Sequence, residues 1–251
     1  MIDRKSYFIR SSGPNLEAAK KALEWIVQKK KVFLAVLGYS ILGGMISDIF
    51  GENFIRNLKK YGRASLNDIE VTLVTQRKIL YDGKNCSLIT FYPNLKFLDE
   101  LDSIPNISEM LVVPWSFEEV EPWIRTWNAI ELDNPPHTRK APLISNPVVR
   151  QALKSLTACI NVSTGIAHPL DRDRAIQTFE ILRDGEEVFN PADVKAYLIA
   201  ECGWKATDAQ EVAELVQKVL DRKKLRKMER PAWKKNILEI WRKKAAEITE
   251  A

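Results

Sequence analysis

The stretch "SYFIRSSGPNLEAAKKALEWIVQKKKVFLAVLG", residues 6–38, changes its hydrophobic period twice. SYFIR (6–10) has the composition of a strand, and NLEAAKKALEWIVQ (15–28) repeats apolar residues at helical spacing. VFLAVLG (32–38) is an unbroken apolar run, which is typical of a strand buried on both faces of a parallel sheet. Strand, helix and buried strand in this order predict a βαβ unit with parallel strands and a right-handed crossover.

The same alternation continues to about residue 134. We expect a helix at 41–60, strands at 69–75 and 87–92, a short helix at 95–101, a last strand at 110–114 and a last helix that begins near Glu121. Asp82-Gly83 is a turn signal that favours a hairpin between the third and fourth strands. The first 134 residues are therefore predicted to form a Rossmann-like α/β domain, a mostly parallel sheet with helices on both faces.

Four prolines in DNPPHTRKAPLISNP (133–147) interrupt both helix and strand, and they predict a linker over residues 135–147. Residues 148–251 show no comparable strand pattern, so we expect an all-α helical domain. The expected helices cover about 147–160, 170–184, 191–202, 208–223 and 231–247. Pro231 suits a first helical turn, and Thr207 with Gln210 has the spacing of a capping box. VSTGIAHP (162–169) could be a loop or a short strand.

The composition of the 251 residues is that of an ordinary globular protein, with 45% hydrophobic and 28% charged residues. The longest apolar runs are far shorter than the roughly 20 residues needed to span a bilayer, and the first ten residues are too charged for a secretory signal. We expect a cytoplasmic protein with no membrane partner. Three scattered cysteines and two histidines predict neither a disulfide framework nor a metal site, and we expect no cofactor.

Ligands of a doubly wound sheet bind beyond the carboxyl ends of its strands. Four loops lie there: Ser11-Ser12-Gly13, Gly38-Tyr39-Ser40, Tyr92-Pro93-Asn94 and Trp115-Ser116. Glycine-bearing loops that enter a helix can offer backbone N–H groups to a phosphate, although neither glycine loop has a phosphate-binding fingerprint and tight turns are the alternative reading. The predicted ligand-binding residues, for a small phosphorylated ligand, are Ser11, Ser12, Gly13, Gly38, Ser40 and Trp115.

SYFIRSSGPNLEAAKKALEWI (6–26) followed by KVFLAVLGYSILGG (31–44) resembles the α/β C-terminal domain of pyruvate kinase and its stand-alone relatives. The resemblance implies the same α/β fold, and in that family similar loops can receive a phosphorylated effector. The second loop keeps only Ser40 where the family tends to have several hydroxyls and a threonine. We therefore use the resemblance for the fold and not for the ligand.

Three tryptophans follow the strand at 110–114. Trp123, Trp127 and Ile130 fall at i, i+4 and i+7, the pattern of one buried helical face, so we expect these two tryptophans in the core. Trp115 lies at the strand end, where a pocket wall and simple packing are equally good readings. His168 precedes Asp171 and Asp173, and acidic residues in a first helical turn explain this cluster better than acid–base chemistry does.

The positive charge is concentrated near the C-terminus, where Lys218 to Lys244 include twelve Lys and Arg against three Asp and Glu. Such density favours phosphate backbones, and a solvated helix surface is the alternative. Trp233, Ile237 and Trp241 at i, i+4 and i+8 predict an apolar seam that docks this helix with its cations outward. The predicted nucleic-acid-binding residues are Arg222, Lys223, Lys224, Arg226, Lys227, Arg230, Lys234, Lys235, Arg242 and Lys243.

Residues 191–227 could form a helix-turn-helix with Gly203 in the turn, but Asp208, Glu211 and Glu214 at the start of its second helix would repel phosphates. The leading hypothesis is a non-enzymatic two-domain protein, with a Rossmann-like sensing or assembly domain and a helical domain that binds nucleic acid at low specificity. One alternative is a protein or enzyme that binds a nucleotide or phosphorylated metabolite at the sheet edge. The other is a structural protein-interaction module. The sequence nominates no nucleophile and no oligomeric state.

Overall fold

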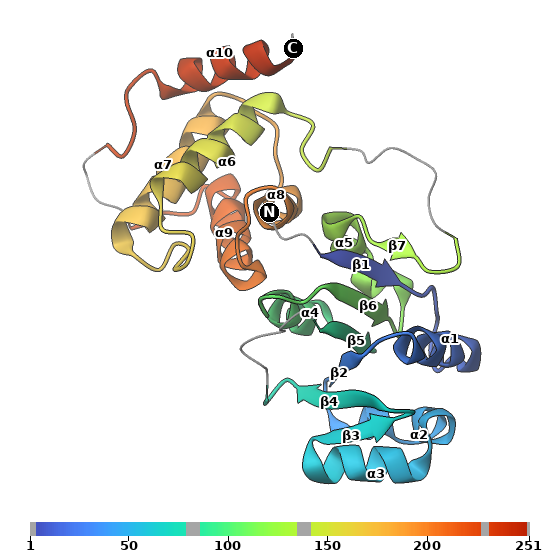
Figure 1. Cartoon of the computed structure of the whole chain (residues 1–251). Coiled ribbons are helices and arrows are strands. Elements are labelled where there is room, and N and C mark those ends of the chain that lie inside the picture. Colours follow the sequence, from blue (N-terminus) through green and yellow to red (C-terminus); the bar gives the residue numbers. More distant parts are fainter. Residues whose placement is uncertain (1–3, 79–85, 135–141, 227–230, 250–251) are drawn as a thin grey trace. The chain divides into compact units, whose positions relative to one another are not determined.

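The computed structural model describes residues 4–78, 86–134, 142–226 and 231–249 (Figure 1). The chain divides into two compact units, one within Asp3–Arg139 and one within Lys140–Ala251. This division falls inside the segment 135–147 that the prolines mark as a linker.

The first unit contains a seven-stranded sheet in the order β3-β4-β2-β5-β6-β1-β7. Neighbouring strands are parallel except for β3 and β4, which are antiparallel. This arrangement confirms the predicted mostly parallel α/β fold. The strands are β1 (Lys5–Phe8), β2 (Lys31–Val36), β3 (Arg63–Leu66), β4 (Ile69–Thr75), β5 (Ser87–Phe91), β6 (Glu109–Val113) and β7 (Ile130–Glu131).

Helices cover both faces of this sheet, as predicted. The apolar residues of α1 (Leu16–Val27), α2 (Met45–Phe50) and α3 (Glu52–Tyr61) share one core with Leu34 and Leu111 of the sheet. On the opposite face, α4 (Leu95–Asp102) and α5 (Phe117–Trp127) share a second core with Phe33 and Met110. Because β2 alternates its side chains between these two cores, its whole run from Val32 to Val36 is buried, which explains the unbroken apolar sequence.

The pairing of the third and fourth predicted strands as a hairpin is wrong, because β2 lies between β4 and β5. The turn signal Asp82-Gly83 itself lies outside the described residues. The hairpin of this sheet instead joins β3 to β4 through Asn67 and Asp68, both of which have positive φ. β3 and β7 were not expected, since four half-exposed residues and two residues are too short to show a strand pattern.

Two predicted helices have different boundaries in the structure. The helix expected at 41–60 is divided into a 3₁₀ turn η1 (Tyr39–Leu42), α2 and α3, and the breaks fall at Gly44 and Gly51, which have positive φ. Helix α5 begins at Phe117 rather than near Glu121, and Pro122 lies inside it. Burial of Val120 and Trp123, on either side of the proline, offsets the backbone hydrogen bond that the proline cannot donate.

The described part of the second unit consists of helices and connecting turns, which confirms the predicted all-α region. The helices are α6 (Pro147–Cys159), α7 (Pro169–Asp184), α8 (Pro191–Ala200), α9 (Ala206–Leu220) and α10 (Ile237–Thr249). Helix α10 packs on α6, α9 packs on both α7 and α8, and Trp204 is fully buried. No helix among the described residues is long and apolar enough to cross a membrane.

Two expected details of this unit are wrong. Helix α10 begins at Ile237, so Pro231 is not in its first turn. Lys205 is the N-cap of α9, which places Thr207 inside the helix and excludes the predicted capping box. For residues 162–169 the sequence left a loop and a short strand open, and the structure has a loop over 162–168, with α7 beginning at Pro169.

Candidate functional site

Eight of the ten cations predicted to bind nucleic acid lie in described residues, and all eight are exposed: Arg222, Lys223, Lys224, Arg226, Lys234, Lys235, Arg242 and Lys243. We call these eight residues the basic surface. Lys227 and Arg230 lie outside the described residues. Within the described chain, two of the eight form ion pairs, Lys223 with Asp221 at 3.5 Å and Arg242 with Glu187 at 3.0 Å. Exposed pairs of this kind contribute little free energy, so the positive charge of the surface is largely uncompensated.

Two tryptophans, Trp233 and Trp241, pack the C-terminal part of the basic surface against the helical core. Trp241 is fully buried, and its Nε1 donates a hydrogen bond of 3.1 Å to Ser155 Oγ on α6. Trp233 Nε1 donates a hydrogen bond of 2.9 Å to Thr178 Oγ1 on α7, and the two indole rings meet edge to face at 5.5 Å. Trp233 lies just before α10 rather than within it. The apolar seam thus fixes a segment whose lysines face solvent.

Residues 145–242 match the family model described as a domain of unknown function, DUF1889. No curated protein and no solved structure matches the chain. The DUF1889 region contains α6 to α9, both anchoring tryptophans and most of the basic surface. The match assigns no activity to this region.

Helices α8 and α9 of the DUF1889 region are packed together and joined by a short turn in which Gly203 has φ +72°. The exposed side of α9 carries Glu211 and Glu214, which would face the phosphates of a bound duplex. Asp208 does not lie on that exposed side, because its side chain packs against Gly165. Burial raises the pKa of its carboxyl group. Contact between this helix pair and DNA therefore remains a prediction, and the negative charges of α9 disfavour it.

His168 occupies the N-cap of α7, where its Nδ1 accepts a hydrogen bond from the Leu170 backbone at 3.3 Å. Asp171 lies in the first turn, 3.6 Å from Arg174. Across the residues that the structure describes, no group of three His, Cys, Asp or Glu side chains is placed to hold a metal ion. The role of His168 that the structure displays is that of a helix cap.

The sheet edge of the first unit brings together part of the predicted ligand site. Ser11 Oγ donates a hydrogen bond of 2.5 Å to the carbonyl of Pro114, and the Gly13 amide donates one of 2.7 Å to the carbonyl of Trp115. Gly13 has φ +63°, a conformation that favours glycine. Trp115 is 47% exposed. The loops after β1 and β6 are therefore tied to each other, and in this arrangement the Ser11 hydroxyl is already engaged.

Gly38 and Ser40, which were also predicted to bind the ligand, are separate from the loops after β1 and β6. Gly38 and Ser40 lie beyond the end of β2, and β5 separates β2 from β6. Tyr92 occupies the end of β5, has φ +52°, and meets Trp115 edge to face at 5.2 Å. Burial raises the pKa of Tyr92, and its buried hydroxyl lies near the Asn15 backbone outside hydrogen-bond geometry. A bulky residue held at positive φ is the feature of this edge that the sequence does not reveal.

Trp123 is buried in the core, as predicted, whereas Trp127 is half-buried and packs against the same core. Trp123 Nε1 and Trp127 Nε1 both donate to the Asp102 carboxylate, at 3.1 Å and 2.8 Å. Arg4 donates a hydrogen bond of 2.6 Å to the same carboxylate, and its guanidinium lies 4.1 Å from the centre of the Trp127 ring. The side chains of Arg4 and Asp102 are 1% and 2% exposed, so this is a buried structural network.

Proposed function

We propose that the protein binds nucleic acid with low sequence specificity through the basic surface. The proposal rests chiefly on the solvent exposure of eight cations, of which six form no ion pair with a described carboxylate. Cations held in this way can contact successive phosphates and release the counterions that surround them. The tryptophan anchors support the proposal because they fix one end of the segment before any ligand binds.

Phosphate contacts position a protein on nucleic acid, whereas contacts with base edges specify the sequence. The basic surface offers lysines and arginines, and the exposed side of the neighbouring helix α9 offers carboxylates. We therefore expect binding that depends on phosphate charge and little on sequence. In this proposal the first unit has a non-enzymatic role in sensing or assembly. No disulfide bond joins the three cysteines, which is in keeping with a cytoplasmic location.

The salt dependence of binding tests this proposal. A variant with Lys223, Lys224, Lys234 and Lys235 all changed to Gln should bind a fluorescent duplex more weakly. The slope of log K against log salt should become shallower by about 3 to 4, because each lost phosphate contact removes about 0.9. Fluorescence anisotropy at several salt concentrations measures both quantities.

A matched control removes the same charge from the first unit, by changing the exposed lysines Lys5, Lys20, Lys30 and Lys96 to Gln. The control should retain the slope of the unchanged protein. An equal loss in both variants would show a general charge effect and would refute the assignment of the surface. So would wild-type affinity in the variant of the basic surface.

A further inference from the structure

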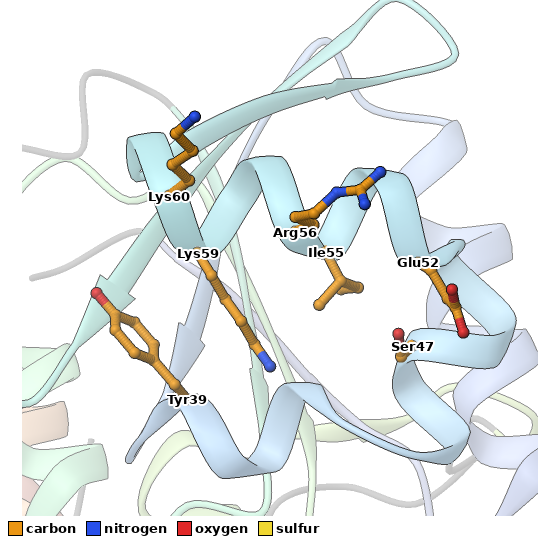
Figure 2. Close-up of a pocket in the computed structure, with 7 residues that line it drawn as sticks. All are labelled: Tyr39, Ser47, Glu52, Ile55, Arg56, Lys59 and Lys60. Carbon is orange, nitrogen blue, oxygen red and sulfur yellow. The ribbon is translucent and has the colours of Figure 1, made fainter.

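An open pocket of about 520 Å³ lies in the first unit between α3 and the segment formed by η1 and α2 (Figure 2). Its lining residues are Tyr39, Ser47, Glu52, Ile55, Arg56, Lys59 and Lys60. The volume is within the range of sites that bind small molecules. Of these residues only Tyr39 lies in a loop that the sequence nominated, because the pocket forms only where one face of α3 meets η1.

The charge of this pocket is mainly positive. Arg56, Lys59 and Lys60 lie at i, i+3 and i+4 on one face of α3. None of the three forms an ion pair with a carboxylate of the described residues; Arg56 donates to the amide oxygen of Asn53, and the Lys60 ammonium lies 5.0 Å from the Tyr61 ring centre. Glu52, one turn before Arg56, is not paired with it. The pocket therefore holds three cationic groups, and none of them is paired with Glu52, the one carboxylate of its lining.

The orientations of the side chains distinguish the two lysines. In Figure 2 the Lys59 side chain extends from α3 across the groove toward η1, whereas Lys60 projects away from the groove. Lys59 is accordingly half-buried and Lys60 is exposed. Tyr39, which is 54% exposed, stands at the same end as Lys59, and Ser47 and Glu52 stand at the other end. The pocket thus has a cationic, aromatic end and a hydroxyl and carboxylate end.

A purely structural role explains only part of this arrangement. Lysines in the last turn of a helix stabilise the negative end of its dipole, which applies to Lys59 and Lys60. Arg56 lies farther from that end. Tyr39 belongs to a different element and keeps its ring exposed beside the cations. The pairing of a cation directed into the groove with an exposed ring is what a ligand would use.

We propose that this pocket binds a phosphate-bearing small molecule of nucleotide size that carries a planar ring. Lys59 contacts the phosphate, Tyr39 packs against the ring, and at the far end Ser47 donates or accepts a hydrogen bond and Glu52 accepts one. The proposal does not depend on nucleic-acid binding by the second unit, since every residue that it uses lies in α3, η1 or α2.

Calorimetric titration of the full chain with ADP, pyrophosphate and adenosine tests the proposal. ADP should bind more tightly than pyrophosphate or adenosine, because it engages both the cations and the ring. Lys59→Gln should weaken ADP binding about tenfold, the effect of one lost charged hydrogen bond. Tyr39→Leu should weaken ADP binding and leave pyrophosphate binding unchanged.

Lys96→Gln is the matched control, because Lys96 is exposed on α4, which covers the opposite face of the sheet. This variant should bind ADP as the unchanged protein does. Lys59→Arg keeps the charge and should retain most of the affinity, which separates loss of the phosphate contact from loss of folding.

Three results would overturn the proposal. The first is the absence of ADP and pyrophosphate binding at millimolar concentration. The second is an equal loss of affinity in Lys59→Gln and Lys96→Gln. The third is a short oligonucleotide that needs Lys59 for binding while ADP does not bind, which would assign these cations to a nucleic-acid surface. None of these results bears on the basic surface of the second unit, which has its own variants.

Discussion

Each unit contains a pair of tryptophans that donate their indole N–H groups to interior partners, but the partners differ in charge. Trp123 and Trp127 share the carboxylate of Asp102, which is also paired with Arg4. Trp233 and Trp241 instead donate to the neutral hydroxyls of Thr178 and Ser155. The same side chain therefore completes a buried ion pair in one unit and fixes a charged, exposed segment in the other.

This difference determines how strongly the loss of a partner destabilises each tryptophan pair. Removing one partner of a buried ion pair is costly, because it leaves an unpaired charge in the interior. A neutral hydroxyl leaves no such charge, and Ser155 also donates to the Gln151 carbonyl at 2.9 Å. We infer that the first pair is essential to the sheet unit, whereas the second pair mainly sets where the cations lie.

The largest effect is expected from Asp102→Ala. This change leaves the Arg4 guanidinium buried without its carboxylate and leaves two indole N–H groups without an acceptor. The free energy of unfolding should fall by about 3–5 kcal/mol, as measured by denaturant titration. Glu119→Ala, at an exposed position of α5, should change it by less than about 0.5 kcal/mol. A loss from Asp102→Ala as small as that of the control would mean that the ion pair is hydrated.

Trp241→Ala should have a somewhat smaller effect on stability and a second effect on binding. Removing the buried ring leaves a cavity between α10 and α6, and the cost should be about 3 kcal/mol. Because the anchor is lost, affinity for the fluorescent duplex should fall although every cation is retained. Hydrogen exchange of α6 and the anisotropy titration report the two effects.

Trp115→Ala is the control for that experiment, because this tryptophan is 47% exposed and lies in the other unit. It should change neither the stability of the second unit nor duplex binding. Full affinity in Trp241→Ala would show that the cations bind equally well from an unanchored segment, and the contrast between the two pairs would lose its functional meaning.

Periodicity sufficed for the parts of the fold that are long and buried. The apolar run of β2, the helical spacing of α1 and the strand pattern of β4 all appear within one or two residues of their predicted positions. The burial of Trp241 was also predictable from its helical spacing, although Trp233 lies before α10. In each case the decisive information is local, within about two helical turns.

What could not be predicted depends on contacts between distant residues. Arg4 and Asp102 are separated by 98 positions, and nothing in either neighbourhood indicates a partner. Strand order is also determined by contacts between distant residues. For this reason the sequence favoured a hairpin of β4 and β5, whereas β2 separates them in the structure. The α3 pocket and the positive φ of Tyr92 also arise only when elements meet. Sequence reasoning therefore found the charges of the second unit and missed the concave site of the first.

The smallest expected effects come from changing one tryptophan of each pair to phenylalanine. Both changes remove an indole N–H and a similar amount of ring. Trp127→Phe takes a hydrogen bond from a buried carboxylate and should cost about 1.5–3 kcal/mol, whereas Trp241→Phe takes one from a hydroxyl and should cost about 1 kcal/mol. Trp241 is the more deeply buried of the two, so ring loss alone would give the opposite order. If denaturant titration finds Trp241→Phe the more costly, packing rather than partner charge distinguishes the two pairs.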